Sequence, residues 1–358
     1  MRAALLPRTA KGAAERAIGV SALVLAALAP LLFNDYWLSF ILTQTLLLGV
    51  AAASLIFLSA YGGMISLAQV ALYGIAGFAL GNMVTQAEAK GLNLGWDPWL
   101  SVLLAILITT AVGLVFGAVA ARSFGIYFLM ITLTYGVIVN FFFGQVTALS
   151  GFSGLSGIAR YAPDLVGGGT DRTRLYYTAL IVAVVVYALI RFLLRTPFGL
   201  ALQGIRDDPV RMASLGYNVA LHRTLAFGFG AFIASLAGIL YVWWNGQIDP
   251  ATVGLAGTIN LLIVAVIGGL ARVEGAWLGA FAFIVINNYV RDVSVPVVGG
   301  SFNTVIGLVF LAIVIVSPDG LMGVWDRLTL GRRPTSGGPT PENVRESAGV
   351  KASPGVGP

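Results

Sequence analysis

The chain of 358 residues contains no cysteine and one histidine. The lack of cysteine excludes disulfide scaffolds, zinc ribbons and thiol catalysis. A single histidine leaves little room for a histidine metal centre or a His-based triad, so we expect neither catalytic residues nor a metal site.

Charged residues are also scarce. They make up 10% of the chain and hydrophobic residues 58%, whereas an average globular domain is about 25% charged. A soluble protein of this size cannot bury so much apolar surface in one core, which excludes a cytosolic enzyme and a disordered protein.

The scarce charges avoid ten apolar runs, in which the only charged side chain is Arg191. The runs are 18–33, 40–60, 64–86, 99–121, 125–149, 175–194, 224–245, 258–271, 275–290 and 303–317. About 20 apolar residues span a bilayer as a helix, and a charge at its centre is costly. The sequence therefore predicts an all-α polytopic membrane protein of about ten transmembrane or partly spanning helices. We expect Arg191, at the end of its run, to snorkel towards water.

The positive charges concentrate on one side of the predicted membrane. With the N-terminus inside, the inner segments hold 16 of the 21 Lys and Arg residues, as the positive-inside rule requires. Both termini are therefore predicted to be cytoplasmic, and the net charge of +6 indicates topology rather than nucleic-acid binding. We expect a retained first helix rather than a cleaved signal peptide.

These runs divide the chain into a cytoplasmic segment at 1–17, a transmembrane domain at 18–320 and a cytoplasmic tail at 321–358. The tail is rich in Gly and Pro and is predicted to be disordered from about residue 331.

The runs lack the groups that drive carriers. No Asp, Glu, Lys or His lies in any of them, and the chain has no Gly-Lys dipeptide and hence no Walker A sequence. Proton- or sodium-driven carriers usually have ionisable groups at membrane depth. Any active transport must therefore be powered by another subunit.

The longest inner loop, 195–223, contains two predicted helix starts. Thr196-Pro197 and Asp208-Pro209 each place an N-cap residue before a proline at the first helical position. Gly216 follows as a helix stop. Two short helices could dock another protein or merely connect two spans.

A polar stripe lies in the run at 64–86. Ser66, Gln69 and Tyr73 recur at spacings of three and four, so on a helix they share one face. Such a face lines a pathway or forms hydrogen bonds between helices. The candidate lining residues are Gly62, Gly63, Ser66, Gln69, Tyr73, Gly74, Gly77, Thr132 and Asn140.

Several motifs resemble one family. Residues 197–218, PFGLALQGIRDDPVRMASLGYN, resemble the cytoplasmic loop of LivM-type permeases, the branched-chain amino acid permeases of ATP-binding cassette (ABC) importers. The resemblance spans roughly residues 40–320 and includes 59–78 and 225–279. The chain departs from the family at Leu200 and Gln203, where relatives often have Arg.

The resemblance implies that the loop at 195–223 docks on an ATPase subunit. The implied docking residues are Gly199, Ile205, Arg206, Asp207, Asp208, Pro209, Ala213, Leu215 and Gly216. It also places the outer loop 150–174 opposite a solute-binding protein, with Ser150, Gly151, Ser153 and Gly154 facing that protein. The glycines of this loop predict a flexible segment.

The implied function is a permease subunit of an ABC importer in a bacterial inner membrane, translocating branched-chain or related amino acids by alternating access. The implied partners are a LivH-type second permease, two ABC ATPase subunits that bind ATP and Mg, and a periplasmic or lipid-anchored binding protein. This chain would hold no cofactor. Alternatives are the same machine for urea, amides or small carboxylates, and a passive facilitator.

Overall fold

A computed structural model describes residues 36–86, 91–167 and 171–298, together with Ser21, 24–30, Asn34, Gly307, Leu311 and 320–323. Of residues 290–298 only the backbone is described. The predicted segment at 1–17, half of the run at 18–33, most of the run at 303–317 and nearly all of the tail at 321–358 lie outside the described residues.

Across its described ranges the chain forms helices and no strand. The elements are a π-helix η1 (Trp37–Leu42), α2 (Thr43–Gly62), α3 (Gln69–Val84), α4 (Pro98–Ala120), α5 (Ile126–Gln145), the 3-10 turns η2 (Ile158–Tyr161) and η3 (Asp164–Val166), α6 (Arg172–Arg195), α7 (Pro197–Asp207), α8 (Pro209–Ser214), α9 (Val219–Asn245), the 3-10 turn η4 (Pro250–Val253), α10 (Leu255–Gly268) and α11 (Gly275–Val298).

Within these ranges, five helices are long and apolar enough to cross a membrane: Trp37–Gly62, Pro98–Ala120, Ile126–Gln145, Arg172–Arg195 and Val219–Asn245. Three shorter apolar helices accompany them: Gln69–Val84, Leu255–Gly268 and Gly275–Tyr289. The predicted all-α membrane class is confirmed. The count of about ten helices and the sidedness of the termini stay predictions.

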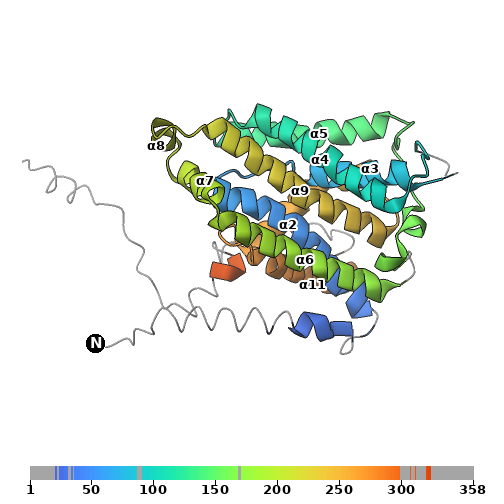
Figure 1. The fold of residues 1–358 in the computed structure, drawn as a ribbon. Coiled ribbons are helices and arrows are strands. Elements are labelled where there is room, and N and C mark those ends of the chain that lie inside the picture. Colours follow the sequence, from blue (N-terminus) through green and yellow to red (C-terminus); the bar gives the residue numbers. More distant parts are fainter. Residues whose placement is uncertain are drawn as a thin grey trace, which may run out of the picture.

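Two of the long helices form the interior of the bundle (Figure 1). α9 packs against α2, α3 and α4, while α2 also contacts α6, α10 and α11. In their most apolar stretches, 78% of the η1–α2 residues and 72% of the α9 residues are buried, against 22% for α4 and α6. α2 and α9 thus pack against protein, and the outer helices leave their apolar sides for lipid.

The run at 64–86 is not one helix, which corrects the predicted polar stripe. α2 ends at Gly62, and Gly63 adopts a left-handed backbone with φ of +64°, a conformation that costs glycine little. Residues 64–68 form a non-helical link, and α3 begins at Gln69. Ser66 therefore lies in the link instead of on a helical face.

At 16 residues, α3 is about 24 Å long at 1.5 Å per residue. This is shorter than the ~30 Å hydrocarbon core of a bilayer. Non-helical backbone at membrane depth is tolerated only where protein or a cavity satisfies its polar groups.

Candidate coupling surface and translocation lining

α7 is the inner part of the predicted docking loop. Thr196 caps it by accepting a hydrogen bond from the Gly199 amide at 3.3 Å. Gly199 is buried so tightly that an added Cβ would lie 2.3 Å from the Leu193 carbonyl oxygen. Ile205 is also buried. These two predicted docking residues therefore fix α7 to the bundle and are not available to a partner.

Arg206 joins α7 to the end of α2. Its Nη1 donates to the Ala60 carbonyl at 2.5 Å, and its Nε and Nη2 donate to Asp207 Oδ1 at 2.9 and 2.7 Å. The side chain also lies against Gly63, where an added Cβ would be 2.7 Å from Arg206 Cγ. Arg206 thus anchors the loop beside the link, and both Arg206 and Asp207 remain exposed.

α8 is the exposed part of the loop and stands at one end of the bundle (Figure 1). Asp208 Oδ1 accepts from the Arg211 amide at 3.0 Å, and Pro209 takes the first helical position, as predicted. Gly216 ends the segment with φ of +90°. Both predicted caps and the predicted stop are confirmed.

None of the six residues of α8 is buried. Val210 is 75% exposed and Leu215 66% exposed. With Pro209 half-buried, the exposed predicted docking residues are Arg206, Asp207, Asp208, Ala213, Leu215 and Gly216. We call residues 207–216 the coupling surface.

Three predicted lining residues meet at the link between α2 and α3. Thr132 of α5 accepts a hydrogen bond from the Leu67 amide at 3.1 Å and donates to the Leu129 carbonyl at 3.0 Å. Ser66 Oγ accepts from the Ala68 amide at 3.3 Å. These hydroxyl groups satisfy amides that the missing helical turn would otherwise leave unpaired.

Gln69 completes this group. Its Nε2 lies 3.5 Å from Ser66 Oγ, and its buried Oε1 has no hydrogen-bond partner. Thr132 and Ser66 therefore close the helix break, and Gln69 retains a free acceptor.

The other predicted lining residues of α3 and α5 lie near η4. The Tyr73 ring is 5.3 Å from that of Tyr241. Gly77 lies against Ile248, and Asn140 Nδ2 donates to the Pro250 carbonyl at 2.6 Å. The structure thus divides the candidate lining into a link group and an η4 group, and most of their polar atoms make contacts within the chain.

The outer loop is packed, which corrects the expectation of flexibility. Ser150 is fully buried, and Leu155 forms an antiparallel bridge with Ile248 through hydrogen bonds of 2.8 and 2.9 Å. At Gly154 an added Cβ would lie 2.2 Å from the Ile248 carbonyl oxygen. Phe152 is 74% exposed and marks the surface of this loop.

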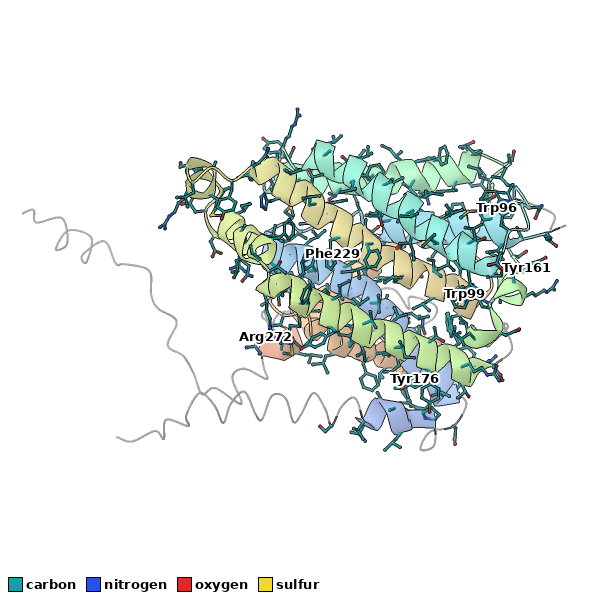
Figure 2. All side chains as sticks on the ribbon, in the orientation of Figure 1. Trp96, Trp99, Tyr161, Tyr176, Phe229 and Arg272 are labelled. Carbon is teal, nitrogen blue, oxygen red and sulfur yellow. The ribbon has the colours of Figure 1, made fainter. Side chains whose placement is uncertain are left out.

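Arg191, predicted to snorkel towards water, forms an ion pair within the bundle. Its Nη2 pairs with Glu274 Oε1 at 2.5 Å, and Tyr187 donates to the same oxygen at 2.8 Å. This cluster lies at the end of α6 near the turn that contains Arg272, which Figure 2 places at the same end as α7. The pairing depends on a residue 83 positions away, so the run at 175–194 could not reveal it.

Aromatic side chains gather at the opposite end of the bundle. Trp96, Trp99 and Tyr161 lie there, far from α7 and α8 (Figure 2). The Tyr161 hydroxyl donates to the Gln86 carbonyl at 2.9 Å. Trp and Tyr are typical of membrane–water interfaces, and their presence at this end is what such an interface predicts.

Sequence reasoning missed two features. Arg223, at the end of the inner loop, is 4% exposed, and no local pattern distinguishes it from a solvated loop arginine. It also missed η4, which Asp249 caps by accepting from the Thr252 amide at 2.8 Å. Here a signal existed, because Asp249-Pro250 repeats the Asp208-Pro209 device.

Comparison with known proteins agrees with this geometry. A family model described as "Branched-chain amino acid transport system / permease component" matches residues 37–317, the whole bundle with its coupling surface. The chain belongs to this family. It is 28% identical over 255 residues to the high-affinity branched-chain amino acid transport system permease protein LivM of Salmonella typhimurium, covering 64% of this chain and 59% of that protein.

Members of the family with another name also match. The permease protein BraD of Pseudomonas aeruginosa is 27% identical over 270 residues, 73% of this chain and 86% of BraD. LivH of Escherichia coli is 24% identical over 271 residues, 73% of this chain and 86% of LivH. No solved structure matches the chain. This permease component is thus a LivM-type, multi-pass membrane protein. It spans about three-fifths of the LivM proteins of Salmonella typhimurium and Escherichia coli.

Proposed function

We propose that this chain is one membrane-spanning subunit of an ABC importer that moves branched-chain or related amino acids across a bacterial inner membrane by alternating access. The observation that carries the proposal is the coupling surface. Its helix α8 has no buried residue, is capped at both ends and follows α7, which packs on the bundle through four buried residues. A short, well-capped helix with exposed apolar residues suits docking on a partner.

The connections of α8 suit it to transmitting force. α7 contacts α2, α6 and α9, and α8 leads directly into the 27 residues of α9. Packed helices move as rigid elements, so a push on α8 shifts whole helices rather than one loop. Opening one side of the bundle and closing the other would follow from such a shift.

The source of energy lies outside this chain. None of the five candidate spans contains Asp or Glu, so they offer no carboxylate relay for protons. We infer two ATPase subunits that themselves bind ATP and Mg, one of which docks on the coupling surface. A neutral lining with the free Gln69 oxygen suits a zwitterion that passes without a change of charge.

The remaining partners follow from the family and from the outer loop. Relatives named LivH also match this chain, which supports a second, homologous permease beside it. The packed outer loop offers a fixed surface, with Phe152 exposed, for a periplasmic or lipid-anchored solute-binding protein. Ligand titration of that soluble protein with leucine, urea, an amide and a small carboxylate would identify the substrate.

The test is the replacement of Asp208-Pro209 by Gly-Gly in the importer reconstituted in vesicles with ATP and leucine. Loss of the cap and of the proline is expected to unwind α8, because an N-cap contributes about 0.5–2 kcal/mol. Leucine uptake should stop while membrane insertion persists. The matched control replaces Asp97-Pro98, an identical cap on α4, and should retain uptake. Normal uptake by the Asp208-Pro209 variant would contradict the docking role.

A further inference from the structure

Arg223 is a buried cation at the start of α9. It lies five residues after Asn218, which caps α9 by accepting from the Leu221 amide at 3.0 Å, and so it follows the coupling surface directly. The side chain is 4% exposed. The ion pairs found in the described part of the chain do not include Arg223.

Backbone carbonyls compensate this charge. Arg223 Nη1 donates to the carbonyls of Ala121 at 2.9 Å and of Ser123 at 2.8 Å. Both belong to the end of α4 and the turn that follows it. The last carbonyls of a helix lack intrahelical donors and carry the negative end of its dipole, so a guanidinium is well placed there.

The same guanidinium touches two further segments. Arg223 Cζ lies 4.3 Å from the centre of the Phe124 ring, in the α4–α5 turn. It lies 5.4 Å from the centre of the Phe128 ring, at the start of α5. Its Nε lies 3.1 Å from the sulfur of Met64, in the link between α2 and α3. One side chain therefore joins α9, the α4–α5 turn and the link.

We propose that Arg223 is a positioning residue that carries movement of the coupling surface to the link at 64–68. The inference rests on the proposed function, because it requires a partner that moves α8. A planar guanidinium that both donates to carbonyls and stacks on rings fixes orientation in a way that a lysine ammonium does not. When the start of α9 shifts, Met64 and the α4–α5 turn shift with it.

The destination of this movement is the link group of polar residues. Met64 is two residues from Ser66, and Thr132 holds the same link through the Leu67 amide. Gln69, with its free oxygen, begins the next helix. Arg223 thus connects the surface that receives the force to the residues whose rearrangement would open or close a route.

The first test measures leucine uptake and ATP hydrolysis by the complete importer in vesicles. Arg223→Met is expected to lower uptake by at least about fivefold, the lower end of typical coupling between sites, with ATP hydrolysis retained. Arg223→Lys should be intermediate. The control, Arg122→Ala, removes an exposed arginine from the same α4–α5 turn and should leave both rates unchanged.

The second test follows the link itself. Because the chain has no cysteine, Ile65→Cys, at a 38% exposed position of the link, creates its one thiol. ATP should change the rate at which a maleimide labels this thiol, and Arg223→Met should abolish the change while leaving the rate without ATP as it was. A residue that only stabilises the fold would not produce this pattern.

Three results would overturn the inference: coupled uptake by Arg223→Met, loss of uptake and ATP hydrolysis in equal proportion, or a labelling rate that never responds to ATP. The last leaves the proposed function standing if uptake still needs ATP. Should Arg223→Met fail to assemble, Phe124→Ala, which keeps both carbonyl hydrogen bonds, is expected to reduce uptake in the same direction.

Discussion

At the scale of single residues, two buried glycines leave no room for a Cβ atom, one because of a neighbouring side chain and the other because of neighbouring backbone. At Gly74 an added Cβ would lie 1.8 Å from Val253 Cγ1, a side chain, whereas at Gly238 it would lie 2.0 Å from the Tyr73 carbonyl oxygen. Gly74→Ala should destabilise the protein by about 1–3 kcal/mol, and Val253→Ala in the same chain should restore most of the loss. Gly238→Ala should be equally harmful but not be rescued by Tyr73→Ala, since the obstacle is backbone. Thermal unfolding in detergent measures both pairs, and equal rescue would contradict the packing described.

At the scale of elements, the break between α2 and α3 depends on a hydroxyl group from α5. Thr132→Val keeps the shape of the side chain but leaves the Leu67 amide, now 3.1 Å from Thr132 Oγ1, without an acceptor. An unpaired buried donor costs about 1–3 kcal/mol, so the variant should melt at a lower temperature. Thr132→Ser, which keeps the acceptor, should have a melting temperature close to that of the parent. Equal melting temperatures for the Val and Ser variants would show that the hydroxyl group is dispensable.

At the scale of the whole molecule, the coupling surface and the outer loop should face opposite sides of the membrane. The chain has no cysteine, so single thiols at Val210 and Phe152, 75% and 74% exposed, can be labelled without background. A membrane-impermeant maleimide added to intact cells should label Phe152→Cys and spare Val210→Cys, and permeabilised cells should show both labelled. The reverse pattern would place the coupling surface on the outer side of the membrane and would contradict ATPase docking there.

A second prediction at this scale concerns energy. Reconstituted without ATPase partners, the chain should not accumulate leucine against a gradient, because its spans hold no carboxylate relay and it has no Walker A sequence. The measurement is radiolabelled leucine in vesicles with and without an imposed proton gradient. Accumulation driven by the gradient alone would contradict the importer-subunit proposal.

What the sequence could predict was local chemistry. Hydrophobic runs indicated membrane helices, and the Asp208-Pro209 and Thr196-Pro197 pairs indicated where α8 and α7 begin, because a cap acts within one helical turn. Gly216 likewise marked an end. Each of these signals concerns neighbouring residues and the bilayer. The structure confirms both caps and the stop, and it has five helices long and apolar enough to span, whereas the run at 64–86 is broken.

What the sequence could not predict was which partner a residue meets across the bundle. The apolar run at 64–86 hides its break, since Ser66 and Thr132 become a closure only when α5 lies beside the link. Gly199 and Ile205 belong to a docking motif yet are buried. Glycine at position 154 allows the backbone of the outer loop to approach Ile248 closely, whereas the composition of the loop alone predicts a flexible segment.

One helix, α9, connects the coupling surface with the outer loop. α9 starts where the coupling surface ends, and at its far end the chain continues within three residues to Ile248, which pairs with Leu155 of the outer loop. If binding inside alters the outer loop through this rod, thermodynamic reciprocity demands that an occupied outer loop alter affinity inside by the same factor. Docking of a substrate-loaded binding protein on the outer loop would then change the affinity of the coupling surface for the ATPase subunit before any substrate has crossed the membrane.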